Sequence, residues 1–169
     1  NAEQDIFLLT ALGLQNVRFL LSEKTLIYIP LVISALATGT FYIPQKKHSK
    51  RRLQFFKKTT TFLKETNYSI AASSEGVHPH FHGIAPFNRG IYHMALEAKI
   101  PIVPMFIYVP EENNMTAFKY AKKGTLKIEL MQEISTKEWT LENLDTHIND
   151  VRNLFVKRFN ELNPTNKTT

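Results

Sequence analysis

The sequence predicts a single α/β domain with a mostly parallel central sheet flanked by helices, and three observations lead to that prediction. Short apolar runs rich in strand-forming residues alternate with longer segments whose apolar residues recur at helical spacing. The chain has 169 residues, of which 43% are hydrophobic, and this is enough for one domain with a core of its own. No internal repeat or low-complexity linker divides the chain. We therefore expect one domain over residues 1–169.

The first half of the chain is predicted to alternate between helices and strands. Leu53, Phe56 and Leu63 recur at helical spacing among basic residues. Ser22 is a suitable N-cap for a helix that starts at Glu23, because its hydroxyl can accept a hydrogen bond from the free amides of the first turn. The predicted helices are 5–12, 23–38 and 49–65, and the predicted strands are 17–21, 41–43 and 68–72.

The second half is predicted to contain two helices and two strands. Residues 89–99 have apolar side chains on one helical face, and residues 100–109 form a continuous apolar run typical of strands covered on both faces. Residues 125–134 alternate in polarity, which is typical of a strand nearer an edge. The apolar stripe of a carboxyl-terminal helix is formed by Leu144, Ile148, Val151, Phe155 and Phe159.

The net charge, the lack of cysteine and the length of the apolar stretches limit which partners and locations we expect for this chain. The net charge of +6 favours an anionic partner, such as phospholipid headgroups or coenzyme phosphates. We do not expect nucleic acid, because no recognition motif accompanies the charge. The chain has no cysteine, which excludes disulfides and thiolate catalysis and fits a cytosolic location. No stretch reaches the roughly 18 apolar residues of a transmembrane helix, so residues 26–37 form either a core helix or one that docks on a membrane.

A dense basic segment stands out in the middle of the chain. It is either a solvated helix face or a surface for acidic lipid, coenzyme phosphates or an acidic carrier protein. Its cationic residues are Lys46, Lys47, Lys50, Arg51, Arg52, Lys57 and Lys58.

Two segments are candidates for one binding site. Ligands of parallel sheets collect at the carboxyl ends of strands. Residues 44–47 follow the strand at 41–43, and residues 73–90 follow the strand at 68–72. Both segments therefore leave from strand ends where a ligand would bind.

Five short blocks stand in order along the first two thirds of the chain, namely Asp5, Gly39–Ile43, Glu75–Gly76, Pro86–Gly90 and Ile100–Pro104. Taken in this order, they resemble the blocks of the glycerolipid acyltransferases, that is, the 1-acylglycerol-3-phosphate acyltransferases and their lysophospholipid acyltransferase relatives. The resemblance covers about residues 1–110.

The resemblance implies the fold of that family and its reaction. A fatty acyl group would pass from the thioester of acyl-CoA or acyl carrier protein to a hydroxyl of a lysophospholipid, in phospholipid biosynthesis or remodelling. It implies no cofactor and no metal. The protein would work at the cytoplasmic face of a membrane, with the acyl donor, the lysophospholipid and the membrane surface as its partners.

The first block of the family is a histidine and an aspartate separated by four residues, and Asp5 looks like the aspartate. The histidine would fall one position before Asn1. In the family the histidine takes the proton of the acceptor hydroxyl, and the aspartate orients the imidazole. We therefore expect the 169-residue chain to fold but to transfer acyl groups very slowly. The alternative for Asp5 is a solvated carboxylate at a helix start.

The resemblance implies an acceptor pocket with two departures from the family pattern. Gln45 and His78 occupy the places of two phosphate-binding arginines, and neither reproduces a bidentate arginine contact. Either the acceptor carries a different headgroup, or nearby cations such as Lys46 and Arg89 stand in. The implied acceptor-binding residues are Gly39, Gln45, Lys46, Glu75, Gly76, His78 and Arg89, and Pro104 is implied in binding the acyl donor or acyl chain.

Three alternating histidines, His78, His80 and His82, raise the alternative of a metal site. Pro79 and Gly83 imply a turn, and no carboxylate completes a familiar ligand set, so we predict a solvated or substrate-lining loop and no metal. Two other functions stay open: an inactive lipid-binding module of the same fold, and a histidine-rich metal-binding domain.

Overall fold

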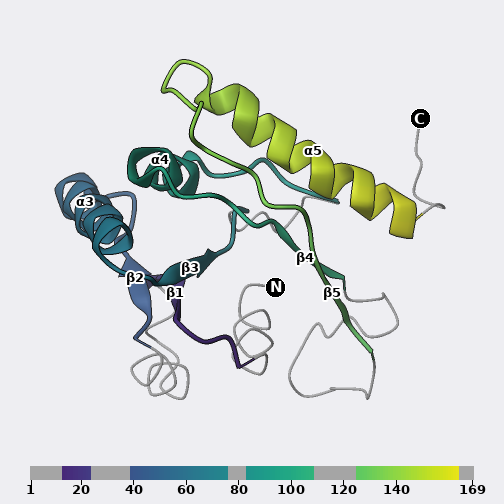
Figure 1. Cartoon of the computed structure of the whole chain (residues 1–169), viewed down its shortest axis with the longest axis horizontal. Helices are drawn as coiled ribbons and strands as arrows, with labels where there is room; N and C mark the ends of the chain where they lie inside the picture. The colour runs from purple at the N-terminus through teal and green to yellow at the C-terminus, as the bar shows by residue number, and fades with distance from the viewer. Residues whose placement is uncertain (1–12, 24–38, 76–82, 109–124, 164–169) are drawn as a thin grey trace.

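A three-stranded parallel sheet forms one part of the domain (Figure 1). The computed structural model describes residues 13–23, 39–75, 83–108 and 125–163. The strands are β1 (Val17–Ser22), β2 (Phe41–Ile43) and β3 (Ser69–Ala72), in the order β2-β1-β3. Ser22 lies opposite Ile43, and Leu20 lies opposite Ala72. These strands confirm the predicted ones to within a residue, and with them the α/β class.

Two helices pack together over this sheet. α3 (Ser49–Glu65) connects β2 to β3, and α4 (Arg89–Ala98) packs beside it. Buried Leu20 of β1, Leu63 of α3 and Met94 of α4 meet in one apolar cluster. The two helices approach closely at Gly90, where a Cβ atom would lie 2.8 Å from Cζ of Phe56. In Figure 1 both helices lie on the same side of the sheet.

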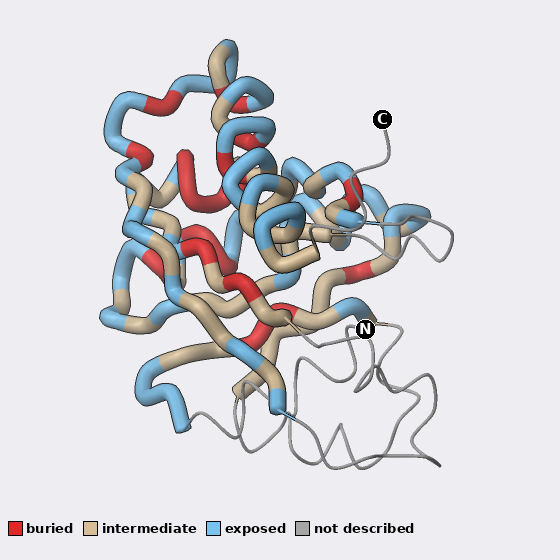
Figure 2. Tube along the Cα trace, turned by 90° about the vertical axis from the view of Figure 1, so that its right-hand side faces the viewer, coloured by how far each residue is buried: buried red, intermediate tan, exposed pale blue. Residues whose placement is uncertain are grey.

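The long helix α5 (Leu144–Leu162) anchors a second apolar cluster. Leu144, Ile148 and Val151 are buried there, as the predicted stripe requires. Tyr92 and Leu96 of α4 belong to the same cluster, together with Trp139. α4 is therefore buried on two sides, against α3 and the sheet on one and against α5 on the other. Figure 2 shows the buried residues gathered between the elements, while the outer turns of the helices are exposed.

A separate antiparallel pair completes the described strands. β4 (Met105–Tyr108) pairs with β5 (Lys127–Leu130), so that Met105 lies opposite Leu130. Within the described residues this pair is not hydrogen-bonded to the parallel sheet. β4 is shorter than the apolar run of residues 100–109, because Pro101 and Pro104 have no amide for a strand ladder.

The predicted helix 5–12 lies outside the described residues, as does the predicted helix 23–38 apart from its first residue, Glu23. Ser22, predicted to cap the second of them, is the last residue of β1. No helix in the described part of the chain is long and apolar enough to cross a bilayer.

Candidate functional site

The carboxyl ends of the parallel strands bring the two predicted segments to one edge of the sheet. β2 and β3 flank β1 and run in the same direction. Gln45 and Lys46 follow the end of β2, and Glu75 follows the end of β3. All three residues therefore leave the same edge, where ligands of parallel sheets bind.

Glu23, just after β1, fixes the turn that follows β2. Its carboxylate accepts hydrogen bonds from the backbone amide of Gln45 at 3.4 Å and from Nη2 of Arg51 at 3.0 Å. Burial alone would raise the pKa of Glu23, but these two hydrogen bonds, together with the nearby positive charge of Arg51, hold the pKa below its ordinary value. Nη1 of Arg52 donates to the Pro44 carbonyl at 2.9 Å. The turn is thus held by its main chain, and Lys46 is exposed beside it.

Gly39 has a structural reason to be glycine. Its φ angle is +62°, in the left-handed region that side chains disfavour. A Cβ atom at this position would overlap the guanidinium of Arg18. That guanidinium lies over the ring of Tyr68, 4.7 Å from its centroid. Gly39 therefore lets the chain enter β2 against an arginine that also packs at the start of β3.

Glu75 closes the loop that follows β3. Its Oε1 accepts a hydrogen bond from the backbone amide of Ala85 at 2.7 Å. Glu75 and Phe87 form an isolated antiparallel bridge, and the amide of Asn88 donates to the Ser74 carbonyl at 2.7 Å. Residues 74–75 and 84–88, which we call the loop stem, are thus tied together in short antiparallel fashion.

Two residues outside the predicted set support the loop stem. The hydroxyl groups of Ser74 and Tyr92 are hydrogen-bonded at 2.9 Å. Tyr92 is 1% exposed, and its burial raises the pKa of its hydroxyl to about 12, although the Ser74 hydrogen bond partly opposes this. From α5, Arg152 donates to the carbonyls of Ala85 at 3.0 Å and Ile84 at 2.6 Å. The stem is therefore held from α4 and from α5.

Sequence reasoning missed both supports, although a signal for one was present. Arg152 directly follows Val151, at the margin of an otherwise apolar helical stripe, and a cation in such a place needs an acceptor. Tyr92 gave no such signal, because α4 was expected to bury one face and buries two.

Arg89 and Pro104 lie in structural positions. Nη1 of Arg89 is 3.2 Å from Oδ2 of Asp145, and Nη2 donates to the Leu141 carbonyl at 3.3 Å. Arg89 thus ties the start of α4 to the start of α5. Pro104 is buried, and its carbonyl accepts a hydrogen bond from the Met131 amide at 2.9 Å. Both residues therefore make contacts within the fold.

The remaining predicted site residues, Asp5, Gly76 and His78, lie outside the described residues, as do His80 and His82. In the part of the chain that the structure describes, no group of three or more side chains could hold a metal ion. A cavity of about 370 Å³ lies between β5 and α5, and none of the predicted site residues lines it.

A family model described as "Acyltransferase" matches residues 2–108, more than half of the chain. The chain belongs to the acyltransferase family. This confirms the resemblance seen in the five sequence blocks. The matched range contains the parallel sheet, α3, the loop stem and α4.

Relatives within the family are distant and longer. A 1-acyl-sn-glycerol-3-phosphate acyltransferase of Limnanthes douglasii is 23% identical over 144 residues, which cover 80% of this chain and 48% of the relative. An enzyme of the same name from Haemophilus influenzae is 26% identical over 141 residues, covering 83% of this chain and 58% of the relative. The chain thus spans about half the length of the curated relatives it matches.

A solved structure shares the fold. The crystal structure of the 1-acyl-sn-glycerophosphate (LPA) acyltransferase PlsC from Thermotoga maritima matches with a TM-score of 0.63 and 12% sequence identity. The match covers 91% of this chain and 59% of that one. The shared fold therefore extends beyond residue 108, where the family model ends.

Proposed function

We propose that this chain is the acyl-transferring part of an enzyme that moves a fatty acyl group from an acyl-CoA or acyl carrier protein thioester to the hydroxyl of a lysophospholipid. The acceptor is 1-acylglycerol-3-phosphate or a close relative of it, in phospholipid biosynthesis or remodelling. The reaction takes place at the cytoplasmic face of a membrane, where both the acceptor and the product reside.

The observation that carries this proposal is the edge of the parallel sheet. Gln45 and Lys46 follow β2 directly after the family's second sequence block, and Glu75 follows β3 within the third block, so all three leave that edge in an acyltransferase fold. The turn after β2 and the loop stem are each held by several hydrogen bonds. Such support is suited to a site that must hold its ligand in a fixed orientation.

The chemistry requires a base for the acceptor hydroxyl. In the proposed reaction, the acceptor hydroxyl gives its proton to the histidine of the family's first block. Asp5 orients the imidazole of that histidine. The hydroxyl oxygen forms an ester bond to the acyl carbon, and the carbon–sulfur bond breaks. The sulfur leaves with a proton as a free thiol. General-base assistance of this kind contributes about 10²–10⁴-fold in rate.

The headgroup contact needs residues other than those of the family pattern, because Gln45 and His78 replace its two phosphate-binding arginines. A phosphate headgroup needs cations, and Lys46 is an exposed one at the correct edge. Arg89 is less suited, because its guanidinium is engaged by Asp145 and the Leu141 carbonyl. We therefore assign the phosphate contact to Lys46 in place of the missing arginines.

The test uses the full-length natural protein with palmitoyl-CoA and lysophosphatidic acid in mixed micelles. Free thiol is followed by a colorimetric reagent, and the diacyl product is followed by mass spectrometry. We expect thiol and product in equal amounts, and a decrease in kcat of about 10²–10⁴-fold in Asp5→Asn. Equal rates for the wild type and Asp5→Asn would contradict the proposal.

The replaced arginines favour one alternative, an inactive lipid-binding module of the same fold. The same experiment separates the two functions. A protein that binds lysophosphatidic acid but releases no thiol above the Asp5→Asn background is the binding module.

A further inference from the structure

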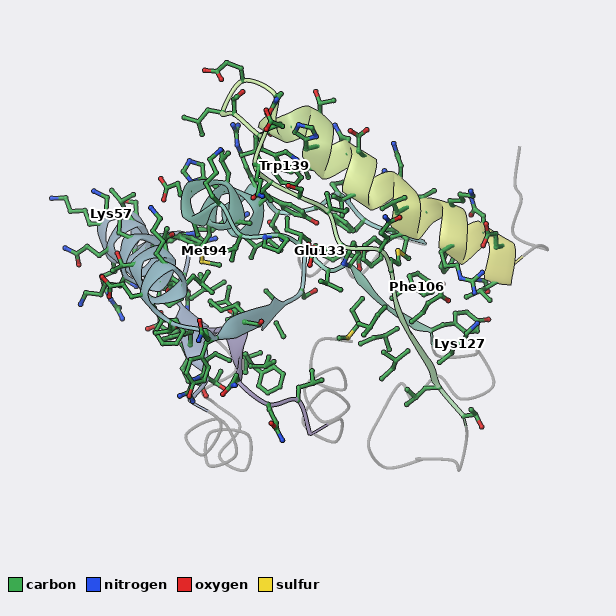
Figure 3. The ribbon with its side chains drawn as sticks, viewed as in Figure 1. Lys57, Met94, Phe106, Lys127, Glu133 and Trp139 are labelled. Carbon is green, nitrogen blue, oxygen red and sulfur yellow. The ribbon has the colours of Figure 1, made fainter. Side chains whose placement is uncertain are left out.

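The outer face of α3 carries a straight line of lysines. Lys50, Lys57 and Lys64 are spaced seven residues apart, which is close to two helical turns, so their side chains leave the same side of the helix. All three are exposed. At about 1.5 Å per residue, the line is ~21 Å long. In Figure 3, Lys57 projects from α3 on the side away from α4.

The orientation of this face is fixed by the packing of the opposite one. Thr59 and Leu63 are buried, and Phe55 and Phe56 pack against the cluster formed by β1, α3 and α4. Phe41 of β2 packs edge-on against Phe55 and against Phe62. α3 therefore cannot turn its lysines inward without losing its contacts with the sheet.

The charge of this face is nearly unopposed. Glu65 is the only acidic residue of α3, at its last position. Arg51, on the flank of the line, is paired with Glu23 at 3.0 Å. Within the described residues, no carboxylate lies within salt-bridge distance of Lys50, Lys57 or Lys64. Exposed Lys58 widens the positive surface.

One apolar side chain lies beside the lysines. Leu53 is 59% exposed, and along the helix axis it falls between Lys50 and Lys57. The leucine adds apolar area beside the cationic line, a combination that favours an interface between water and lipid.

We propose that the line of Lys50, Lys57 and Lys64, together with Leu53, rests on the surface of an anionic phospholipid bilayer. The lysines are spread along a line rather than converging on a point, which suits a planar array of headgroups better than a single phosphate ligand. The choice of a bilayer over an acidic protein rests on the proposed function, because the acceptor is itself a bilayer lipid. α3 would then hold the domain against the membrane that contains its substrate.

The experiment measures binding to vesicles and needs no turnover. The full-length protein is sedimented with sucrose-loaded vesicles of phosphatidylcholine alone or with 30% phosphatidylglycerol, at low salt and at 0.5 M salt. The test variant is Lys50→Gln/Lys57→Gln/Lys64→Gln. The matched control is Lys127→Gln/Lys137→Gln/Lys157→Gln, which removes the same charge from other exposed positions. Circular dichroism checks that both variants are folded.

We expect the wild type to bind anionic vesicles at low salt, and the α3 variant to bind them about 100-fold more weakly, since each lysine near an anionic surface contributes about fivefold. The control variant should lose no more than a few-fold. Equal losses in the two variants, no loss in either, or equal binding of the wild type to neutral vesicles would each overturn the proposal. So would an α3 variant that binds vesicles normally but has lost binding to an acidic acyl carrier protein.

This result is independent of the acyl-transfer assay. If the wild type binds anionic vesicles through α3 but releases no thiol, the proposed enzyme activity is wrong and the membrane surface stands. If thiol is released and the α3 variant still binds vesicles as the wild type does, the enzyme activity stands and the proposed membrane surface is wrong.

Discussion

The Glu75 carboxylate accepts a hydrogen bond from the Ala85 amide at 2.7 Å, and this contact closes the loop that follows β3. The glutamate of the family's third block therefore has a structural contact, in addition to the acceptor contact that the family resemblance implies. The Ala85 contact uses an acceptor oxygen of Glu75, which an uncharged amide side chain can also supply.

Glu75→Gln separates the two roles, because an amide oxygen can still accept from Ala85 while the charge is lost. If the loop contact dominates, Glu75→Gln keeps most of the activity, and Glu75→Ala loses it together with about 1–2 kcal/mol of stability. Steady-state kinetics and urea unfolding of the two variants provide the measurement. Equal loss of activity in both variants, with stability unchanged, would mean that the negative charge of Glu75 acts on the acceptor and that the loop contact is not its main role.

Arg152 should affect the acceptor site from a distance. Arg152→Ala leaves the carbonyls of Ile84 and Ala85 without their donor, so we expect a loss of about 2 kcal/mol in the free energy of unfolding. Because the loop stem loosens, KM for the acceptor should rise about tenfold, while KM for the acyl donor changes little.

Arg158→Ala is the matched control, since Arg158 lies on the same helix and binds Glu129 and Glu161 instead. It should lower stability without moving the acceptor KM. If the two variants raise the acceptor KM equally, Arg152 has no special connection to the site.

Gly39→Ala tests the contact between Gly39 and Arg18. Gly39 and Gly13 both have positive φ angles, +62° and +59°, but a Cβ atom at Gly13 would meet nothing within 4 Å. Gly13→Ala should therefore cost only the left-handed strain, about 1 kcal/mol. Gly39→Ala must also displace Arg18, and we expect about 3 kcal/mol. Chemical denaturation measures both, and similar costs would mean that Arg18 moves aside freely.

Tyr92 should make the fold sensitive to alkaline pH. Its pKa is raised from about 10 to about 12 in the folded state, so its contribution to stability is complete below pH 10 and is lost as pH rises to 12. Tyr92→Phe removes the Ser74 hydrogen bond and should cost about 1 kcal/mol at pH 7. Between pH 10 and 12 the gap between wild type and variant should shrink, as followed by urea unfolding.

Tyr108→Phe is the control for deleting a hydroxyl, since the Tyr108 hydroxyl donates to Asn163 at a partly buried position. A wild type and a Tyr92→Phe variant that lose stability in parallel above pH 10 would contradict the assigned role of Tyr92.

The elements with a clear period were predictable from the sequence. α3 and α5 each bury one stripe, so Leu63 and Val151 carry the helical signal, and β1 to β3 are short apolar runs between turns. The antiparallel direction of β4 and β5 was not predictable, because strand direction depends on pairing between distant residues. The sheet edge followed from the fold class. The position of Arg152 beside an apolar stripe signals that it needs an acceptor, but which carbonyls it binds depends on how α5 packs against the loop stem, which no local pattern encodes.

α4 belongs to both apolar clusters, through Met94 on one side and through Tyr92 and Leu96 on the other. Figure 3 labels Met94 and Trp139, which lie on either side of this helix. If either cluster is exposed to water, one face of the same ten-residue helix α4 loses its apolar contacts. The half with the sheet and the half with α5 should therefore melt together as one cooperative unit, and a truncation that removes α5 would leave a domain unable to keep its remaining half folded.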